Sequence, residues 1–326
     1  MKDFCVLGSG ISGATISSLL TKKYSLEIFD KARGLGGRSS SKRYNKHLNF
    51  DHGLQYLSPK GKKFDAFIKK LAKKGVLKTW NGNHLDYSFK CKISSNKYIG
   101  KKGNSDISKH LIGKIKVNYL SSIKKIDFKK RFWTVTLLNN KKSYFKNLIL
   151  TCPFPQAKLL SKKYIPNKIK KLNVKMEPNM TVMAIYKNSE LSPISSIKFD
   201  DTIVGWASNE NTKKRFKSKL NLWTIQSNIQ WAYKYINKYK DNKNAVSQLL
   251  INRFNFLTGF KNKNLLFKNI HGWKYSYNLK PTNIKSYWSK KYSLGICGDW
   301  FLGPKAEHAW LSANDLFLKI DKKKPT

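Results

Sequence analysis

The fold is decided by the opening stretch DFCVLGSGISGATISSLL, residues 3–20. Residues 3–7 are mostly apolar and β-prone, glycines follow at positions 8, 10 and 13, and a helical pattern continues to Leu20. A second strand is expected at residues 25–29, which end at Asp30. The order strand, glycine turn, helix, strand and acid predicts a βαβ unit of the dinucleotide-binding type.

The glycine spacing has a steric reason. Gly8 permits a tight turn, Gly10 lets a pyrophosphate approach the backbone, and Gly13 lets the helix pack closely on the strand. The first turn of that helix then offers free N–H groups to a phosphate. Asp30 follows Gly13 by 17 residues, a spacing that suits a carboxylate holding the hydroxyls of a ribose.

Two further stretches extend this pattern. In DKARGLGGRSS, residues 30–40, the pair Gly36-Gly37 lets the chain run close under a second phosphate, and Arg38 can bind phosphate through two N–H groups. This pattern is typical of flavin enzymes rather than NAD dehydrogenases. In NFDHGLQY, residues 49–56, Gly53 would place backbone against a flavin ring and Gln55 would hydrogen-bond to it. The same stretch also fits a plain turn between two strands.

Composition limits the remaining possibilities. The 326 residues are 40% hydrophobic, which excludes wholesale disorder. The net charge of +47 comes from lysines spread from Lys2 to Lys324, a distribution that indicates a solvated surface and concentrates phosphate-bearing small molecules nearby. A basic protein that binds nucleic acid or an anionic membrane surface stays open as an alternative, although no specific nucleic acid is expected.

Cysteine usage and hydropathy bear on location. The four cysteines, at positions 5, 91, 152 and 297, form no C-x-x-C pair, so we expect no zinc site, no other metal and no disulfide framework. This usage favours a reducing cytoplasm. No run of about 18 apolar residues is present, so no transmembrane segment is expected.

The chain changes character in its middle third. Residues 157–290 are rich in aromatics, and strands are expected at 180–186, 203–207 and 222–227, with helices at 232–239 and 245–254. The last part returns to the opening style, with a strand at 293–297 and a helix from about 306 to 320. We therefore expect an α/β fold with a discontinuous cofactor domain (1–60, 96–156 and 290–326). A substrate domain built on an antiparallel sheet (61–95 and 157–289) is inserted in it.

Together, these stretches resemble the renalase family of FAD-dependent oxidoreductases, within the wider amine-oxidase-like flavoproteins. The resemblance covers nearly the whole chain. It rests on GSGISG (8–13), DKARGLGGRSS (30–40), FDHGLQY (50–56), YIGKKGNSDISKHL (98–111), NLILTCPFPQAKLL (147–160), WASNENTKK (206–214), HGWKYSYN (271–278) and LGICGDWFLGPKAEHAWLSA (294–313).

The resemblance implies a Rossmann-like, p-hydroxybenzoate-hydroxylase-like fold with noncovalent FAD. It also implies oxidation of isomeric dihydronicotinamide dinucleotides to NAD(P)⁺, with a hydride passed to flavin N5 and electrons passed to O₂ to give H₂O₂. By position, it places Ser12, Arg38, Gln55, Tyr56 and Asp299 at the FAD. The full set of expected cofactor-binding residues is Gly8, Gly10, Ser12, Gly13, Asp30, Lys31, Gly37, Arg38, Gln55, Tyr56 and Asp299.

The substrate side is less determined. Hydride transfer needs no nucleophile or metal, so the flavin itself carries the chemistry. The candidates for catalytic side chains are His271, Trp273, Tyr275 and His308, and further pocket candidates are Trp206, Trp223 and Trp310. Gly272 and Lys274 stand where the resemblance leads us to expect arginines, which leaves the substrate open. An amine oxidase or desaturase on the same scaffold is the first alternative.

Overall fold

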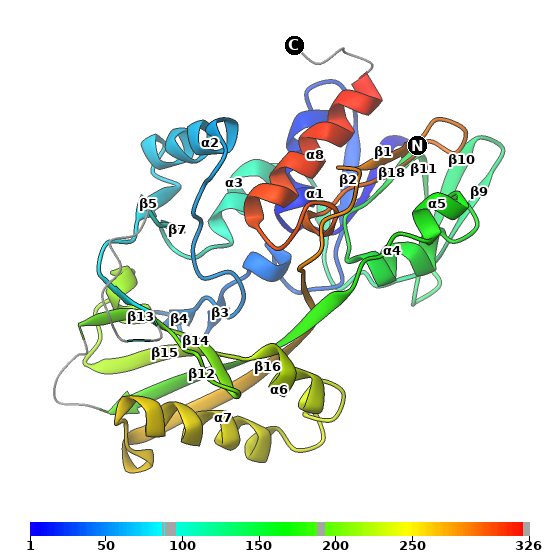
Figure 1. The fold of residues 1–326 in the computed structure, drawn as a ribbon. Helices are drawn as coiled ribbons and strands as arrows, with labels where there is room; N and C mark the ends of the chain where they lie inside the picture. Colours follow the sequence, from blue (N-terminus) through cyan, green and yellow to red (C-terminus); the bar gives the residue numbers. More distant parts are fainter. Residues whose placement is uncertain (87, 89–95, 188–192, 322–326) are drawn as a thin grey trace.

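The structure is a computed structural model that describes residues 1–86, 88, 96–187 and 193–321 (Figure 1). Cys91 and the other residues between 87 and 95 of the expected substrate domain lie outside the described residues, except residue 88. Two sheets organise the chain, one of eight strands and one of six. Within the described ranges, no helix combines the length and apolar character needed to span a membrane.

The first sheet has a parallel centre. Its parallel strands lie in the order β18 (Leu294–Ile296), β11 (Lys142–Leu150), β1 (Lys2–Leu7), β2 (Leu26–Phe29) and β8 (Val117–Asn118). Antiparallel strands extend it: β17 (Tyr287–Ser289) pairs with β18, while β9 (Ile123–Lys129) and β10 (Phe132–Leu137) form a hairpin beside β11.

Both faces of this sheet are covered, which explains the unbroken apolar run in β1. Phe4 and Val6 face α1 (Ile11–Leu20) and α8 (Ala306–Asp321), whereas Cys5 and Leu7 face the opposite core. Successive side chains of a strand point to opposite faces, so a strand buried on both sides must be apolar at every position. Helix α3 (Asp106–Ile112) lies beside α1, and α4 (Phe154–Ser161) and α5 (Asn167–Lys170) cover the other face.

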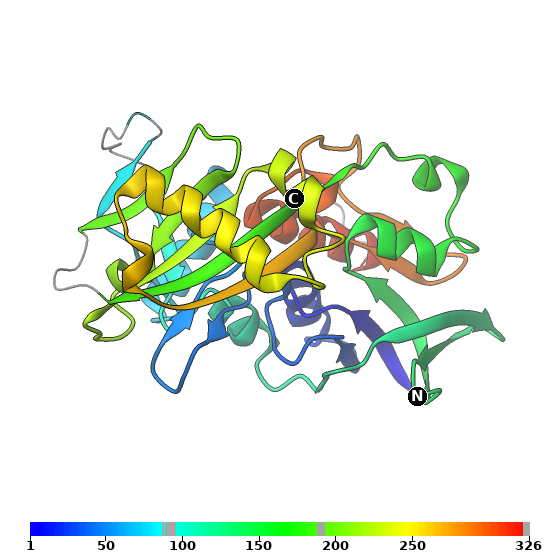
Figure 2. The ribbon, with the colours of Figure 1, turned by 90° about the horizontal axis from the view of Figure 1, so that it is seen from below.

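The second sheet is mainly antiparallel, as expected. Its order is β16 (Leu265–Asn278), β12 (Met176–Lys187), β15 (Leu220–Ser227), β14 (Val204–Asn209), β13 (Ile194–Lys198) and β6 (Asn83–Leu85). Helices α6 (Ile229–Tyr235) and α7 (Lys243–Thr258) cover the face that points away from the first sheet (Figure 1). Seen from below, α7 lies across the long strands β12 and β16 (Figure 2).

Alternation along β12 fixes both faces of the second sheet. Val182 and Ala184 pack towards α7, whereas Met183 and Ile185 pack towards Phe50 of the small hairpin β3 (Lys42–Arg43) and β4 (Asn49–Phe50). The expected fold class, a Rossmann-like α/β sheet joined to an α+β unit on an antiparallel sheet, is confirmed. A smaller unit of α2 (Lys62–Lys73), β5 (Leu77–Thr79) and β7 (Tyr98–Gly100) packs against Trp310 of α8.

The sheets divide the chain differently from two of the expected boundaries. Residues 157–175, expected in the substrate domain, contribute α5 and Ile165 to the core of the first sheet. Residues 287–289, also expected there, form β17 at the edge of the same sheet. Helix α6 starts three residues before the expected position 232, because the side chain of Asn228 accepts a hydrogen bond from the N–H of Gln230 and caps it.

We predict that Gly13→Ala destabilises the fold. A Cβ at Gly13 would overlap the carbonyl oxygen of Gly8, and backbone cannot move aside as a flexible side chain can. We expect a loss of about 1–3 kcal/mol or more in the free energy of unfolding, measured by urea denaturation. Gly34→Ala is the matched control, since a Cβ there meets no described atom within 4 Å. Equal stability of the two variants would refute the close helix–strand contact.

Candidate functional site

The first part of the site is the bare start of helix α1. Gly10 is its N-cap, with extended backbone, and no described side chain caps the helix or places an acid in its first turn. A Cβ at Gly10 would meet only the carbonyl oxygen of Gly36, at 3.7 Å, and the Cα of Gly37, at 4.0 Å. The first N–H groups of α1 therefore have no side-chain cap among the described residues, and they lie at the carboxyl end of β1, where an anion is stabilised.

Asp30 closes the turn from the end of β2. One carboxylate oxygen accepts hydrogen bonds from the N–H of Ser9, at 2.8 Å, and from the Ser9 hydroxyl, at 2.5 Å. The other accepts from the N–H of Ala32, at 2.8 Å. A carboxylate has about four acceptor sites. Asp30 therefore holds the glycine turn in shape and keeps acceptor capacity for a ribose hydroxyl, which remains its predicted role.

The second glycine segment lies directly on the first. The N–H of Gly36 donates to the carbonyl of Ser9, at 3.2 Å, and Gly36 forms an isolated bridge with Gly10. Gly36 and Gly37 have φ of 109° and 52°, a conformation that side chains other than glycine rarely adopt. The two glycine-rich segments thus meet backbone to backbone, and they fit a pyrophosphate held by N–H groups.

Arg38 and Asp299 form a pair that the sequence did not suggest. The guanidinium of Arg38 donates to both oxygens of Asp299, at 2.9 and 2.5 Å, and to the carbonyl of Ser276, at 2.5 Å. Each residue was expected to touch FAD separately. The structure joins them across 261 positions of sequence, at the start of η4 (Asp299–Phe301). Their contacts to a cofactor remain predictions, and in the structure each side chain already binds the other.

The other expected FAD residues are spread around this core. Ser12 is buried in the first turn of α1 and donates to the sulfur of Cys297, at 3.3 Å, while Lys31 is exposed. Gln55 is buried, and its amide donates to the carbonyls of Asp51 and Gly53. The predicted hydrogen bond from Gln55 to a flavin therefore competes with contacts inside the protein.

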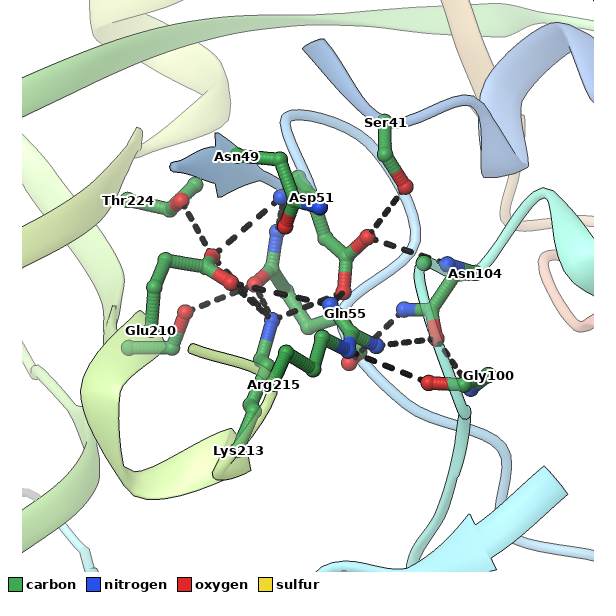
Figure 3. A network of polar contacts seen from close by, with 12 residues as sticks. Ser41, Asn49, Asp51, Gln55, Gly100, Asn104, Glu210, Lys213, Arg215 and Thr224 are labelled. Carbon is green, nitrogen blue, oxygen red and sulfur yellow. Dashed lines mark hydrogen bonds and ion pairs between the residues drawn. The ribbon is translucent and has the colours of Figure 1, made fainter. Parts of the chain in front are cut away.

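Gln55 contacts a buried ion cluster, which consists of Asp51, Glu210, Lys213 and Arg215 (Figure 3). The Nζ of Lys213 lies 3.0 Å from an oxygen of Asp51 and 3.0 Å from an oxygen of Glu210, and Arg215 donates to Asp51 at 2.5 Å. All four side chains are at most 1% exposed. The charges cancel, which allows the cluster to be buried without a free ion.

The cluster joins segments from both parts of the chain (Figure 3). Asp51 follows β4 and also accepts from Ser41 and from the N–H of Asn104, which precedes α3. Glu210 begins η2 (Glu210–Lys213) and accepts from Thr224 of β15, at 2.6 Å. The amide oxygen of Gln55 accepts from the hydroxyl of Ser208, at 2.7 Å, and from Lys213, at 3.4 Å. Loop 51–56 is thereby fixed between the sheets.

Electrostatics keeps Asp51 ionised. Burial by itself would raise the pKa of its carboxyl, but the neighbouring Arg215 and Lys213, with hydrogen bonds from Ser41 and Asn104, lower the pKa well below its usual value. None of the four cluster residues was expected as a site residue from the sequence. The one hint in the sequence was the stretch NENTKKR, residues 209–215, in which an acid is followed closely by lysines and an arginine. Such a stretch is equally typical of a solvated loop.

A group of three rings includes His52 of loop 51–56 and packs against that loop. His52, His271 and Trp273 form a ring cluster with centroids 5.0 Å apart for His52–His271, 5.1 Å for His52–Trp273 and 4.3 Å for His271–Trp273. The indole N–H of Trp273 donates to the carbonyl of His52, at 2.8 Å. Burial, the other histidine and Lys42 lower the pKa of His52 to about 3, and burial with Lys42 and Lys240 lowers the pKa of His271 to about 4. Both rings are therefore neutral at pH 7.

The remaining candidates separate into different environments. Tyr56 packs between Trp80 and Trp206, with ring centroids at 6.1 and 5.8 Å, and the indole nitrogen of Trp206 is buried without a hydrogen-bond partner among the described residues. Tyr275 packs against the core of the first sheet. His308 lies in the first turn of α8, where its Nδ1 is likewise without a described partner.

Two pocket candidates pack against apolar side chains, Trp223 fully buried and Trp310 partly buried. Trp223, at 1% exposure, packs against Phe254 and Phe260 inside the second sheet. Trp310 stacks on Phe67, with ring centroids 5.3 Å apart. Among the described residues, no three His, Cys, Asp or Glu side chains gather closely enough to hold a metal ion.

Comparison with known proteins agrees with this geometry. Residues 6–71 match the model of an NAD(P)-binding Rossmann-like domain. The whole chain is similar to a putative protoporphyrinogen oxidase from Exiguobacterium sp., with a TM-score of 0.73, 10% identity and 99% of each chain covered. It is also similar to a double mutant of putrescine oxidase redesigned for cofactor binding, with a TM-score of 0.68, 10% identity and 99% of each chain covered.

A third similar structure is cyclohexylamine oxidase from Brevibacterium oxydans, with a TM-score of 0.69, 9% identity, and coverage of 98% of this chain and 99% of that one. At these identities the similarity establishes the fold. The Rossmann-like opening and the arrangement of both sheets are thus shared with oxidases. The expected dinucleotide-binding βαβ unit is confirmed by the match over residues 6–71.

We predict that Lys213→Met strongly destabilises the protein. The substitution leaves Asp51 and Glu210 buried with Arg215 as the single cation of the cluster, and breaking a buried ion pair costs about 3–5 kcal/mol. Urea denaturation measures the loss. Lys214→Met, at the exposed neighbour, should change little, and adding Glu210→Gln to Lys213→Met should restore part of the stability. If Lys213→Met were as stable as the unmodified protein, the ion pairs of Lys213 would not contribute to the stability of the fold.

We also predict an acid-sensitive stability that depends on His52. The unfolded histidine binds a proton below about pH 6.5, but folded His52 does not until its pKa of about 3. Stability therefore falls as the pH drops from 6.5 towards 3, by up to about 1.4 kcal/mol per pH unit from this site. In unfolding curves between pH 7 and 4, His52→Gln should flatten the profile, and the exposed control His47→Gln should leave it unchanged. If the unmodified protein, His52→Gln and His47→Gln all lost stability equally as the pH falls, His52 would not be the source of the acid sensitivity.

Proposed function

We propose that this protein is an FAD-dependent oxidase of the renalase type, which oxidises isomeric dihydronicotinamide dinucleotides. In this reaction the dinucleotide loses a hydride and becomes NAD(P)⁺, while O₂ takes up two electrons and two protons to become H₂O₂. FAD, when bound, supplies the hydride acceptor and the route of electrons to oxygen. The observation that carries the proposal is the uncapped start of α1 at Gly10, faced by Gly36 and Gly37 and flanked by Asp30.

The residues of this chain have separable roles in that proposal. The N–H groups of α1 bind the pyrophosphate, the glycines at 36 and 37 let it approach the backbone, and Asp30 binds a ribose. Arg38 supplies positive charge beside Asp299. Loop 51–56, which the buried ion cluster fixes, supports one side of the flavin ring, and neutral His271 and Trp273 lie against that loop as candidates for orienting the substrate.

An amine oxidase is the second candidate, because putrescine oxidase and cyclohexylamine oxidase have similar folds. Charge argues against it. A protonated amine is repelled by a protein of net charge +47, whereas a dinucleotide with a pyrophosphate is attracted. The lysines near His271 act in the same direction.

Anaerobic bleaching of the flavin tests the proposal and separates the candidates. The purified protein should show bound flavin absorbance, either as isolated or after incubation with FAD and removal of the unbound cofactor. Isomeric dihydronicotinamide dinucleotides should bleach it, while putrescine and cyclohexylamine should not, and readmitted O₂ should restore the colour with one H₂O₂ per dinucleotide. Bleaching by an amine alone would favour the second candidate. A protein that retains no flavin absorbance after incubation with FAD and removal of the unbound cofactor would overturn both.

Gly10→Ala tests the cofactor site directly. The N-cap backbone at Gly10, with φ of −68°, accepts alanine, and the added Cβ has 3.7 Å of clearance from the nearest described atom. The protein should therefore keep its melting temperature in the absence of FAD. Its affinity for FAD should fall at least tenfold, because the methyl group fills the approach of the pyrophosphate. Unchanged FAD affinity would mean that the dinucleotide does not cross this turn.

A further inference from the structure

A hollow of about 420 Å³ lies along β16, the edge strand of the second sheet, and His271 of the ring cluster is part of its lining. We call it the lysine hollow. Its lining includes Lys42, Lys240, Lys243, Lys268, Asn269 and His271. No aspartate or glutamate is among its described lining residues.

The four lysines come from three parts of the chain, since Lys240 and Lys243 are three positions apart, just before and at the start of α7. Lys42 belongs to β3, Lys240 follows α6, Lys243 is the first residue of α7, and Lys268 belongs to β16. Two of them hydrogen-bond to neutral amides: Lys42 to Asn269, at 3.1 Å, and Lys268 to Gln248. The tertiary structure thus brings four lysines to one place, and none of the described lining residues is a carboxylate, an arrangement that favours a bound anion.

The start of α7 adds to this positive field. This helix has 16 residues, and its macrodipole places partial positive charge at the N-terminus. Lys243 stands in the first turn, where acids are usually preferred, and no acid is present there. Burial and the proximity of Lys243 lower the pKa of Lys42, and burial lowers the pKa of Lys268. An anion in the hollow would relieve this crowding of charge.

Gly272 gives the hollow its shape. A Cβ at this position would lie 2.6 Å from Cε1 of Tyr239 and 2.8 Å from Cδ1 of Ile236, so glycine lets Tyr239 pack against the strand. That packing holds the next residue, Lys240, at the edge of β16. His271 lines the hollow and touches the ring of His52, which in turn touches Trp273 beside Gly53.

We propose that the lysine hollow binds the phosphate or pyrophosphate group of a small molecule. Four lysines from three parts of the chain supply the charge, and the amide of Asn269 and the neutral ring of His271 supply directional hydrogen bonds. The site differs from the glycine turns proposed for FAD, since none of its described lining residues belongs to residues 8–13 or 36–38. It stands independently of the proposed function, because binding is measured without turnover.

Calorimetric titration with inorganic pyrophosphate tests the site, on full-length protein saturated with FAD and in about 0.15 M salt. The double variant Lys243→Gln/Lys268→Gln should lose at least tenfold in affinity. The control is Lys62→Gln/Lys63→Gln, which removes the same charge from two exposed lysines at the start of α2. The control should stay within twofold of the unmodified protein. Thermal unfolding of each variant checks that the fold is kept.

The control separates a built site from the general attraction of anions to a protein of charge +47. Equal weakening in both double variants, or unchanged affinity in Lys243→Gln/Lys268→Gln, overturns the proposal. Competition then identifies the source of the phosphate. If NAD⁺ displaces pyrophosphate and loses affinity in the same variant, the hollow holds the phosphates of a dinucleotide. If pyrophosphate binds and NAD⁺ does not displace it, the hollow holds a small free anion.

Discussion

The structure depends on the contact of backbone with backbone at the start of α1. Gly13 sits against the carbonyl of Gly8 so closely that no side chain is tolerated, whereas Gly10 faces Gly36 and Gly37 with 3.7 Å between an added Cβ and the nearest described atom. These contacts bring α1 onto β1 and point its free N–H groups at the carboxyl end of the parallel strands. Any side chain here would either separate helix and strand or fill the path of a phosphate, so the architecture of the first sheet and its candidate site arise from one steric constraint.

The second sheet is joined to this site by charge. Asp51 and Arg215 come from opposite sides of the boundary between the sheets, and Lys213 and Glu210 complete a neutral set. Each ion is expensive to bury alone, but the four together satisfy one another. A displaced loop 51–56 would leave buried charges without partners. The cluster therefore specifies one position for the loop, and the ring cluster of His52, His271 and Trp273 takes its place from that loop.

The sequence predicted the first sheet better than the second. The glycine spacing and the apolar runs locate β1, α1 and β2 to within a residue, because local sterics and strand periodicity decide them. Strand β16, residues 265–278, was not expected as a strand, since lysine, asparagine and glycine interrupt its pattern. Neighbouring β12 supplies its hydrogen bonds over most of its length, and such pairing between distant segments overrides local propensity.

The sequence by itself determined the dinucleotide-binding unit, the α/β class and the overall basic charge, because each is local or additive. The tertiary structure alone decided which ionic groups meet. The Arg38–Asp299 pair, the buried ion cluster and the lysine hollow each unite residues far apart in the chain. The physical reason is that a charge in sequence says nothing about its dielectric surroundings or its partner. The dielectric surroundings and the partner of a charge are set only when the sheets pack. After packing, some lysines are buried in ion pairs, some line the candidate anion site, and others remain solvated.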